Sequence, residues 1–230
     1  MLKFKHNKNL QLKNIYAKIL AVIYYYLYLM HKIFEIPVVI ESKNYVNDLF
    51  IPINDNLFFH KFEHSLEVAY RAVELWMREW LWIEKLEILA ISGIFHDSGF
   101  SIQYDNNEII WAWIAKIFLE NFWYNKEKIK IIKNIIIATT LEKEPNNILE
   151  EIIKDADLDN LWRDDFFEKA QDIKKEIEKN KNIILEEKDW YTNVLKLTYK
   201  QKFYTKTENK ERLLKKIKNV EQLKEFLNEI

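Results

Sequence analysis

The sequence lacks cysteine altogether, and this absence removes several kinds of chemistry at once. None of the 230 residues can form a disulfide, a zinc–thiolate site or a thiolate nucleophile. A reducing compartment suits such a composition, and we therefore expect a cytoplasmic protein. Any bound metal ion must be held by histidine, aspartate or glutamate.

The chain also lacks an excess of charge of either sign. Its 35 basic and 36 acidic side chains leave a formal net charge of −1. Proteins that hold a phosphate backbone by electrostatic attraction carry a strongly basic surface. We therefore expect no nucleic-acid partner.

No apolar run is long enough to cross a bilayer. The longest uncharged run, Ile19 to Met30, has 12 residues and is closed by His31 and Lys32, whereas a spanning helix needs about 20. The region lacks a small-residue cleavage site, so it fits a secretory signal poorly. We expect a helix that packs on the domain or on a second subunit. Membrane contact through residues 15–40 is the less favoured interpretation.

Glycine and proline are scarce, with 2 and 3 copies, and the apolar residues recur at helical spacing from residue 64 onward. This periodicity predicts an all-α protein. Residues 1–41 are expected to form a helical N-terminal extension, and residues 42–230 a single domain. Eight helices are predicted at about 64–78, 84–97, 106–122, 126–140, 147–162, 164–180, 186–203 and 208–228.

Histidines and aspartates interrupt the apolar helices at three places. His64 opens one predicted helix, the pair His96-Asp97 ends another, and Asp157 lies in a third. A single histidine in such a place is most often a hydrogen-bonded core residue. A buried carboxylate, however, costs several kcal/mol unless it is paired or bound to a cation. The set as a whole therefore suggests a divalent metal ion between the helices.

These residues and their surroundings resemble the metal-dependent HD phosphohydrolase family, which is defined by the motif H…HD…D. The similar segments are FFHKFEHSLEV, GIFHDSGF and IIKDADLDNLWRDDFF, and the resemblance extends over about residues 42–228. It implies an HD-domain helical bundle with an additional N-terminal helical segment. It also implies four metal ligands, with Asp155 as a competitor for the last: His64, His96, Asp97 and Asp157.

Two positions depart from the family's pattern. Relatives place an asparagine after the histidine that matches His60, and this chain has Lys61 there. One interpretation is that His60 acts as a general acid that protonates the leaving oxygen. The other is that His60 is a surface histidine at the start of a helix. Asn107 stands where some relatives carry a histidine for a second ion. We therefore expect one divalent ion (Mn, Fe, Mg, Co, Ni or Zn), with Glu108 as a candidate outer ligand.

The resemblance implies a metal-dependent phosphohydrolase that cleaves a phosphomonoester or a phosphodiester, with a nucleotide as the favoured small substrate. His60 and Asp97 are the implied catalytic residues. The alternative is a non-catalytic HD sensor or regulatory protein that binds a metal or a nucleotide. The lysine and asparagine at positions 61 and 107 favour that alternative.

Several of the 8 tryptophans occupy places that suit glycine. Trp111, Trp113 and Trp162 stand where similar HD proteins have glycine, and Trp123 follows a predicted helix end, where a left-handed backbone usually calls for glycine. We hypothesise that most of the tryptophans are UGA codons that the source organism reads as glycine. Genuine tryptophans are the alternative.

Overall fold

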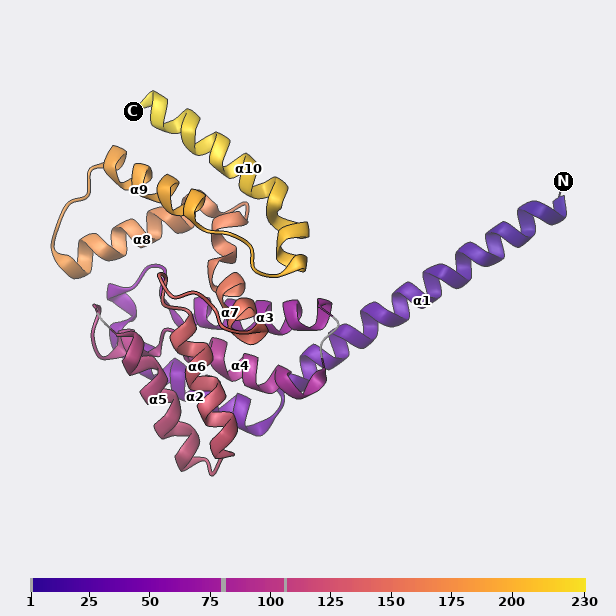
Figure 1. Cartoon of the computed structure of the whole chain (residues 1–230), viewed down its shortest axis with the longest axis horizontal. Coiled ribbons are helices and arrows are strands. Elements are labelled where there is room, and N and C mark those ends of the chain that lie inside the picture. The colour runs from indigo at the N-terminus through magenta and orange to yellow at the C-terminus, as the bar shows by residue number, and fades with distance from the viewer. Residues whose placement is uncertain (1, 80–81, 106) are drawn as a thin grey trace.

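The computed structural model describes the backbone of residues 2–79, 82–105 and 107–230, and the side chains of residues 15–79, 82–105, 107 and 109–230. Within these residues the structure contains α-helices and short 3-10 helices but no strand, which confirms the all-α prediction (Figure 1). The α-helices are α1 (Leu2–Phe34), α2 (Pro37–Phe50), α3 (Phe62–Arg78), α4 (Leu86–Phe95), α5 (Glu108–Asn121), α6 (Lys126–Ala138), α7 (Ile148–Asp157), α8 (Phe166–Lys181), α9 (Glu187–Lys200) and α10 (Lys206–Glu229).

Each of the eight predicted helices corresponds to an observed one, and the differences lie at the ends. The prediction for 84–97 becomes a 3-10 turn η2 (Ile83–Lys85) followed by α4. The prediction for 147–162 becomes α7 followed by a 3-10 segment η4 (Leu158–Trp162). Tighter 3-10 turns are common at helix ends, and periodicity alone does not distinguish them from α-helix.

Helix α4 forms the centre of the larger core. Its residues are apolar on every side, and nearly all of them are buried, as expected for a helix surrounded by others. Gly93 lets α3 come close to it. A Cβ atom at Gly93 would lie 2.5 Å from the Cα of Ala69, nearer than real Cβ atoms approach. This close approach sets the separation of the two helices that carry His64 and His96.

A second, smaller apolar cluster lies after residue 160. Leu161, Trp162 and Phe166 pack there with Tyr191 and Leu223, so the cluster joins η4, α8, α9 and α10. In Figure 1 these helices form a layer beside the larger core, and α7 leads from one to the other. The C-terminal helices therefore lie close enough to contribute side chains to a site built on α3, α4 and α7.

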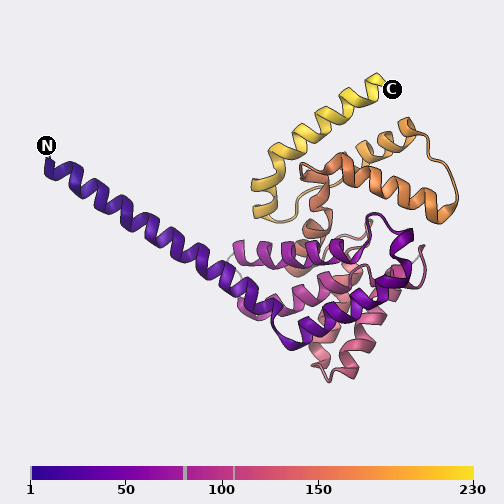
Figure 2. The same cartoon turned by 180° about the vertical axis from the view of Figure 1, so that it is seen from behind.

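Among the residues whose side chains are described, the contacts of helix α1 with the other helices lie in its C-terminal part. Ile33 and Phe34 are buried, and the Tyr26 hydroxyl donates a hydrogen bond of 2.6 Å to the main-chain oxygen of Met77. The preceding part projects away from the other helices in both views (Figures 1 and 2). Among the described residues no single helix has the length and hydropathy of a membrane span. A bent pair, Ile15–Phe34 with Pro37–Asn56, meets that test together at an angle of 64°.

Candidate metal centre

Three helices deliver their polar residues to one point. His64 lies in the first turn of α3, His96 follows the last residue of α4, and Asp157 is the last residue of α7. Asp97 follows His96 and begins the turn into the 3-10 helix η3 (Ser98–Ser101). Helix ends can direct side chains along the axis into a shared space. Residues up to 93 positions apart therefore come together.

The donor atoms of these residues lie close to one another. His64 Nε2 is 3.3 Å from Asp157 Oδ1, and His96 Nε2 is 3.2 Å from the same oxygen. Asp97 Oδ2 lies 3.1 Å from His96 Nε2 and 3.6 Å from His64 Nε2. His64, His96 and Asp157 each offer one ligand atom within 4.8 Å of the other two. His64, His96 and Asp157 thus form a possible metal site, Asp97 lies beside the two histidines, and the set of four ligands stays a prediction.

This arrangement fits a divalent metal ion. Two ligand atoms about 2.1 Å from one ion are separated by about 3.0–3.4 Å at octahedral or tetrahedral angles. Three of the four distances above fall in this range, and the distance of 3.6 Å between His64 and Asp97 is slightly longer. His96 Nδ1 lies 2.8 Å from the main-chain oxygen of Gly93, so Nδ1–H donates there and Nε2 keeps its lone pair. His96 Nε2 and Asp97 Oδ2 are buried and form no hydrogen bond with the described residues. Such buried, unsatisfied donor atoms are typical of a metal site.

The charges within the cluster are strongly coupled. Burial opposes the charged imidazolium of His96, but Asp97 and Asp157 outweigh it and raise the pKa of His96 well above its ordinary value. Burial also opposes ionisation of Asp157, but His96 and His64 hold the pKa of Asp157 well below its usual range. Without a cation, the site therefore retains a proton between imidazole and carboxylate. A bound cation must displace that proton, so metal affinity falls as the pH falls.

The competing carboxylate, Asp155, has a different task. Its oxygens accept hydrogen bonds from the backbone amides of Tyr204 at 3.0 Å and Thr205 at 2.7 Å. These amides lie in the connection from α9 to α10. Burial raises the pKa of Asp155 to about 6, although those hydrogen bonds oppose the shift. The structure therefore places Asp157 with the histidines, and Asp155 holds the C-terminal helices.

His60 lies beside the cluster and is held by a residue that the sequence did not indicate. His60 Nδ1 is 2.5 Å from Oε1 of Glu176, a buried carboxylate on α8. The ring stacks on Phe100 with centroids 4.4 Å apart, and its centroid lies 6.1 Å from that of His64. Nδ1 faces Glu176, so Nε2 is the nitrogen available to a substrate. The structure therefore does not favour the alternative of a free surface histidine.

Glu176 is also bound by the backbone that leads into α3. Its Oε2 accepts hydrogen bonds from the amides of Phe58, Phe59 and His60 at 2.9, 2.8 and 3.0 Å. Consecutive amides of this kind form an anion-binding nest. Burial opposes ionisation, yet His60 and these amides lower the pKa of Glu176 to about 2. In turn, Glu176 outweighs the burial of His60 and raises the pKa of that imidazole.

Asn107, which replaces an expected histidine, has a local structural role. Its side-chain amide donates hydrogen bonds to the main-chain oxygens of Gln103 at 3.2 Å and Tyr104 at 2.9 Å. The residue immediately precedes α5 and ties the preceding loop to it. The side chain of Glu108, expected as an outer ligand, lies outside the described residues.

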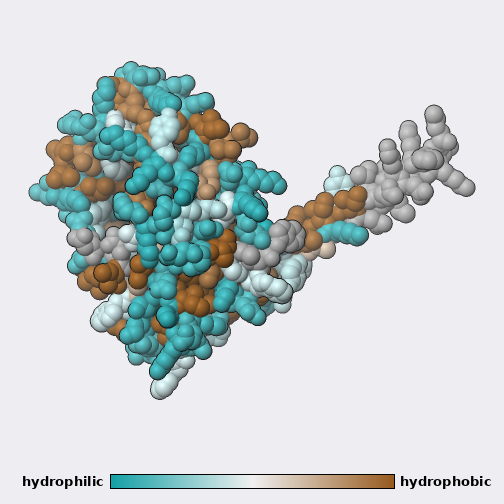
Figure 3. Space-filling model, viewed as in Figure 1, coloured by the Kyte–Doolittle hydropathy of each residue, from teal (hydrophilic) through white to brown (hydrophobic). Residues whose placement is uncertain are grey.

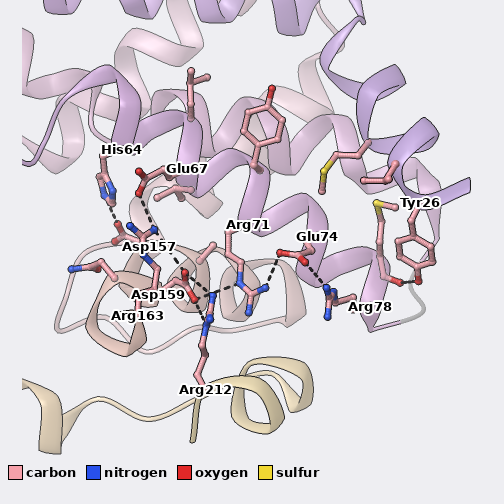
Figure 4. Close-up of a pocket in the computed structure, with 18 of the residues that line it drawn as sticks. Tyr26, His64, Glu67, Arg71, Glu74, Arg78, Asp157, Asp159, Arg163 and Arg212 are labelled. Atoms are coloured by element: carbon pink, nitrogen blue, oxygen red, sulfur yellow. Dashed lines mark hydrogen bonds and ion pairs between the residues drawn. The ribbon is translucent and has the colours of Figure 1, made fainter. Parts of the chain in front are cut away.

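A large cavity begins at the metal cluster and follows α3. It has a volume of about 990 Å³ and is lined by His64 and Asp157 at one end and by Tyr26 and Leu27 of α1 at the other (Figure 4). Figure 4 shows a row of ion pairs along one side of it. Arg163, close to the cluster, contacts Glu67 at 2.9 Å. Of the clustered side chains, His64 and Asp157 therefore border this cavity, whereas His96 and Asp97 lie behind them and do not line it.

Comparison with known proteins agrees with this geometry. Residues 62–159 match the HD domain family. The match covers less than half of the chain, so this segment is similar to an HD domain. It begins with α3, and His64, His96, Asp97 and Asp157 all lie within it. Glu176 on α8, which binds His60, lies beyond the end of the matched segment.

One relative from the curated proteins is an uncharacterized protein of Clostridium beijerinckii. It is 39% identical over 90 residues, a stretch that makes up 38% of this chain and 57% of that protein. This chain thus matches little more than half of that relative's length. No solved structure shows a significant match. The comparisons therefore support an HD-like segment at residues 62–159, and the possible metal site rests on the geometry of His64, His96 and Asp157.

Proposed function

We propose that the HD segment is a metal-dependent phosphohydrolase acting on a phosphomonoester or phosphodiester, with a nucleotide as the favoured substrate. The observation that carries the proposal is the convergence of two imidazoles and two carboxylates, of which His64 and Asp157 line the end of a cavity. His64, His96, Asp97 and Asp157 would hold the cation. A divalent ion there acidifies water and neutralises charge on phosphoryl oxygens.

His60 is the residue best placed to act as general acid. Glu176 fixes Nδ1 and favours the charged imidazolium, so Nε2–H can donate a proton to the leaving oxygen. Phe100 stacks on the ring and restricts its rotation. The substrate's organic group would extend from the cluster along the cavity, where Arg163 lines the wall near Asp157.

A screen of substrates and metals tests the reaction. Purified full chain would be loaded with Mn²⁺, Mg²⁺, Co²⁺, Ni²⁺, Fe²⁺ or Zn²⁺ and incubated with nucleoside phosphates, cyclic nucleotides and simple phosphate esters. We expect release of phosphate or nucleotide that a chelator abolishes and added metal restores. His60→Ala should keep the metal content of the unmodified chain and lower kcat by roughly 10²–10⁴.

The lysine that follows His60 and the asparagine at 107 keep a second candidate open, a metal-dependent nucleotide sensor. A metal-loaded chain that binds a nucleotide tightly and hydrolyses none of the esters would replace the hydrolase with this sensor. If His60→Ala turns over at the unmodified rate, the acid assignment is wrong, while the metal site stands.

A further inference from the structure

Helix α1 differs from the rest of the chain in its charge. Residues 1–34 contain six lysines and no aspartate or glutamate, while the other 29 basic and all 36 acidic side chains follow. The first segment is therefore strongly positive and the remainder is negative. Such asymmetry indicates a partner for the basic segment that carries negative charge.

The exposed part of α1 is apolar around its whole circumference. Consecutive helical residues point about 100° apart, so the uncharged run from residue 19 to residue 30 leaves no polar face. Ten large apolar or tyrosine side chains there are about half exposed or more: Ile15, Tyr16, Ile19, Leu20, Val22, Ile23, Tyr24, Tyr25, Leu27 and Tyr28. In Figure 3 much of this stretch of the projecting arm is brown, with pale residues beside it.

A second copy of α1 would cover this surface poorly. Two paired helices bury one stripe of each helix and leave the opposite side in water. Side-by-side pairing in parallel would also bring two lysine-rich segments together. A lipid surface, in contrast, takes up exposed apolar side chains along the length of a helix, and its anionic headgroups attract lysine.

The length and the aromatic content of the run suit the surface of a bilayer. Twelve helical residues extend about 18 Å, less than the roughly 30 Å of a hydrocarbon core. Tyr24, Tyr25 and Tyr28 are exposed, and tyrosine is favoured where hydrocarbon meets headgroups. Lys18 and Lys32 stand at the two ends of the run and can reach the headgroups.

The surface of the domain next to α1 extends this apolar region. A hollow of about 440 Å³ lies between α1 and the domain, lined by Tyr25 and Leu29 on one side and by Met77, Ile83 and Leu86 on the other. The burial of Phe34 and the hydrogen bond from Tyr26 to Met77 fix the direction in which α1 extends from the domain. We propose that α1 binds the surface of an anionic lipid bilayer, with residues 15–28 among the headgroups and the lysines on lipid phosphates.

Vesicle flotation with the full chain tests the charge component. The probes are phosphatidylcholine vesicles with and without phosphatidylglycerol. We expect binding to the anionic vesicles that weakens as salt is added. Each lysine contributes about a factor of five, so Lys13→Gln with Lys18→Gln should lower partitioning roughly thirty-fold. The matched control, Lys126→Gln with Lys130→Gln on the exposed face of α6, should change it little.

A second pair of variants tests the apolar component. Ile15→Ser, Ile19→Ser and Leu20→Ser together should abolish binding, because these side chains are exposed and line neither hollow beside α1. Ile184→Ser with Leu214→Ser, on exposed residues far along the chain, should not. Circular dichroism and thermal unfolding check that each variant is folded.

Two results would overturn the proposal. One is that the full chain floats with neither kind of vesicle. The other is that the charge of the lipid has no influence while analytical ultracentrifugation shows a dimer that the triple serine variant dissociates. The second result would assign the apolar surface of α1 to another copy of the chain. Neither measurement depends on hydrolysis, so both remain informative if the proposed reaction fails.

Discussion

At the residue scale, two aspartates two positions apart perform different tasks. Asp157 Oδ1 lies 3.3 and 3.2 Å from the Nε2 atoms of His64 and His96. Asp155 instead accepts hydrogen bonds from the amides of Tyr204 and Thr205. Two residues that are two positions apart on a helix point in nearly opposite directions. The two carboxylates therefore cannot both reach the cluster, and only Asp157 does.

This difference gives a matched pair of substitutions. Asp157→Asn should lower divalent metal affinity at least tenfold, because the site loses one negative ligand. Asp155→Asn should retain the metal and lower the free energy of unfolding by about 1–3 kcal/mol, since it weakens buried hydrogen bonds. Metal titration monitored by calorimetry and urea denaturation measure the two effects. The reverse pattern would assign the ligand to Asp155.

Glu176 is the residue that controls the protonation of His60. The acid role requires the imidazolium, so the rate falls as the pH rises through the pKa of His60. Glu176 raises that pKa, and Glu176→Gln should therefore shift the falling limb of the kcat/KM profile to lower pH. Its metal content should be unchanged, because Glu176 is not among the clustered ligands.

Glu168→Gln, an exposed residue on the same helix, is the control and should leave the pH profile in place. If the pH profile of Glu176→Gln coincides with that of the unmodified chain, Glu176 does not influence the reaction. Its role is then structural, as the acceptor of the three backbone amides. Thermal unfolding of both variants separates this outcome from loss of the fold.

At the scale of elements, the turn from α5 to α6 bears on the tryptophan hypothesis. Trp123 has φ of 56° and is 94% exposed, so its backbone is left-handed and its ring packs on almost nothing. Trp76 and Trp162, in contrast, are buried. Trp80 lies outside the described residues. The case for glycine is therefore supported at the helix end, and for the set as a whole it stays a hypothesis.

Trp123→Gly should stabilise the chain. A non-glycine residue in the left-handed region costs roughly 1–2 kcal/mol, and almost no packing is lost at this exposed site. Trp162→Gly should destabilise a chain that carries tryptophan there, because the ring is buried in the second apolar cluster. Chemical denaturation of recombinant variants measures both. Intact mass of the natively expressed protein reports the encoded residues directly.

At the scale of the whole molecule, a buried arginine joins α10 to the HD segment. Arg71 on α3 is 8% exposed and contacts Glu208 and, at 3.0 Å, Glu211 on α10. Arg212 of α10 contacts Asp159 of η4 at 2.7 Å. Arg71, Asp159 and Arg212 line the same cavity that is bordered by His64 and Asp157. The C-terminal helix is thus held against one wall of the cavity.

Removal of this arginine should be costly. Arg71→Met leaves buried carboxylates without their partner, which typically lowers the free energy of unfolding by about 3–5 kcal/mol. Arg78→Met is the matched control on the same helix, because Arg78 also pairs with Glu74 and Glu211 but is about half exposed. Exposed pairs contribute about 0–1 kcal/mol. If urea denaturation shows the same loss in the free energy of unfolding for both variants, the burial of Arg71 does not explain its contribution.

Local patterns in the sequence were enough to predict most of the helices and to select the candidate metal ligands. Apolar spacing is a local property, and it located eight helices with errors mainly at the 3-10 ends. Histidine and aspartate inside apolar helices are costly unless satisfied, so His64, His96, Asp97 and Asp157 could be selected without coordinates. The absence of acidic residues before position 35 was equally visible in the sequence.

Contacts between residues that are far apart in the sequence follow from the three-dimensional packing and could not be predicted from local patterns. Glu176 is one of several glutamates on a charged helix, and nothing in its neighbours distinguishes it from Glu168. Its role follows from the packing of α8 against the amides before α3, 116 residues away. The exposure of α1 could not be predicted either, because an apolar helix has the same sequence pattern whether a domain, a partner or a lipid covers it. Local sequence fixes what a helix must bury, and the three-dimensional packing determines where.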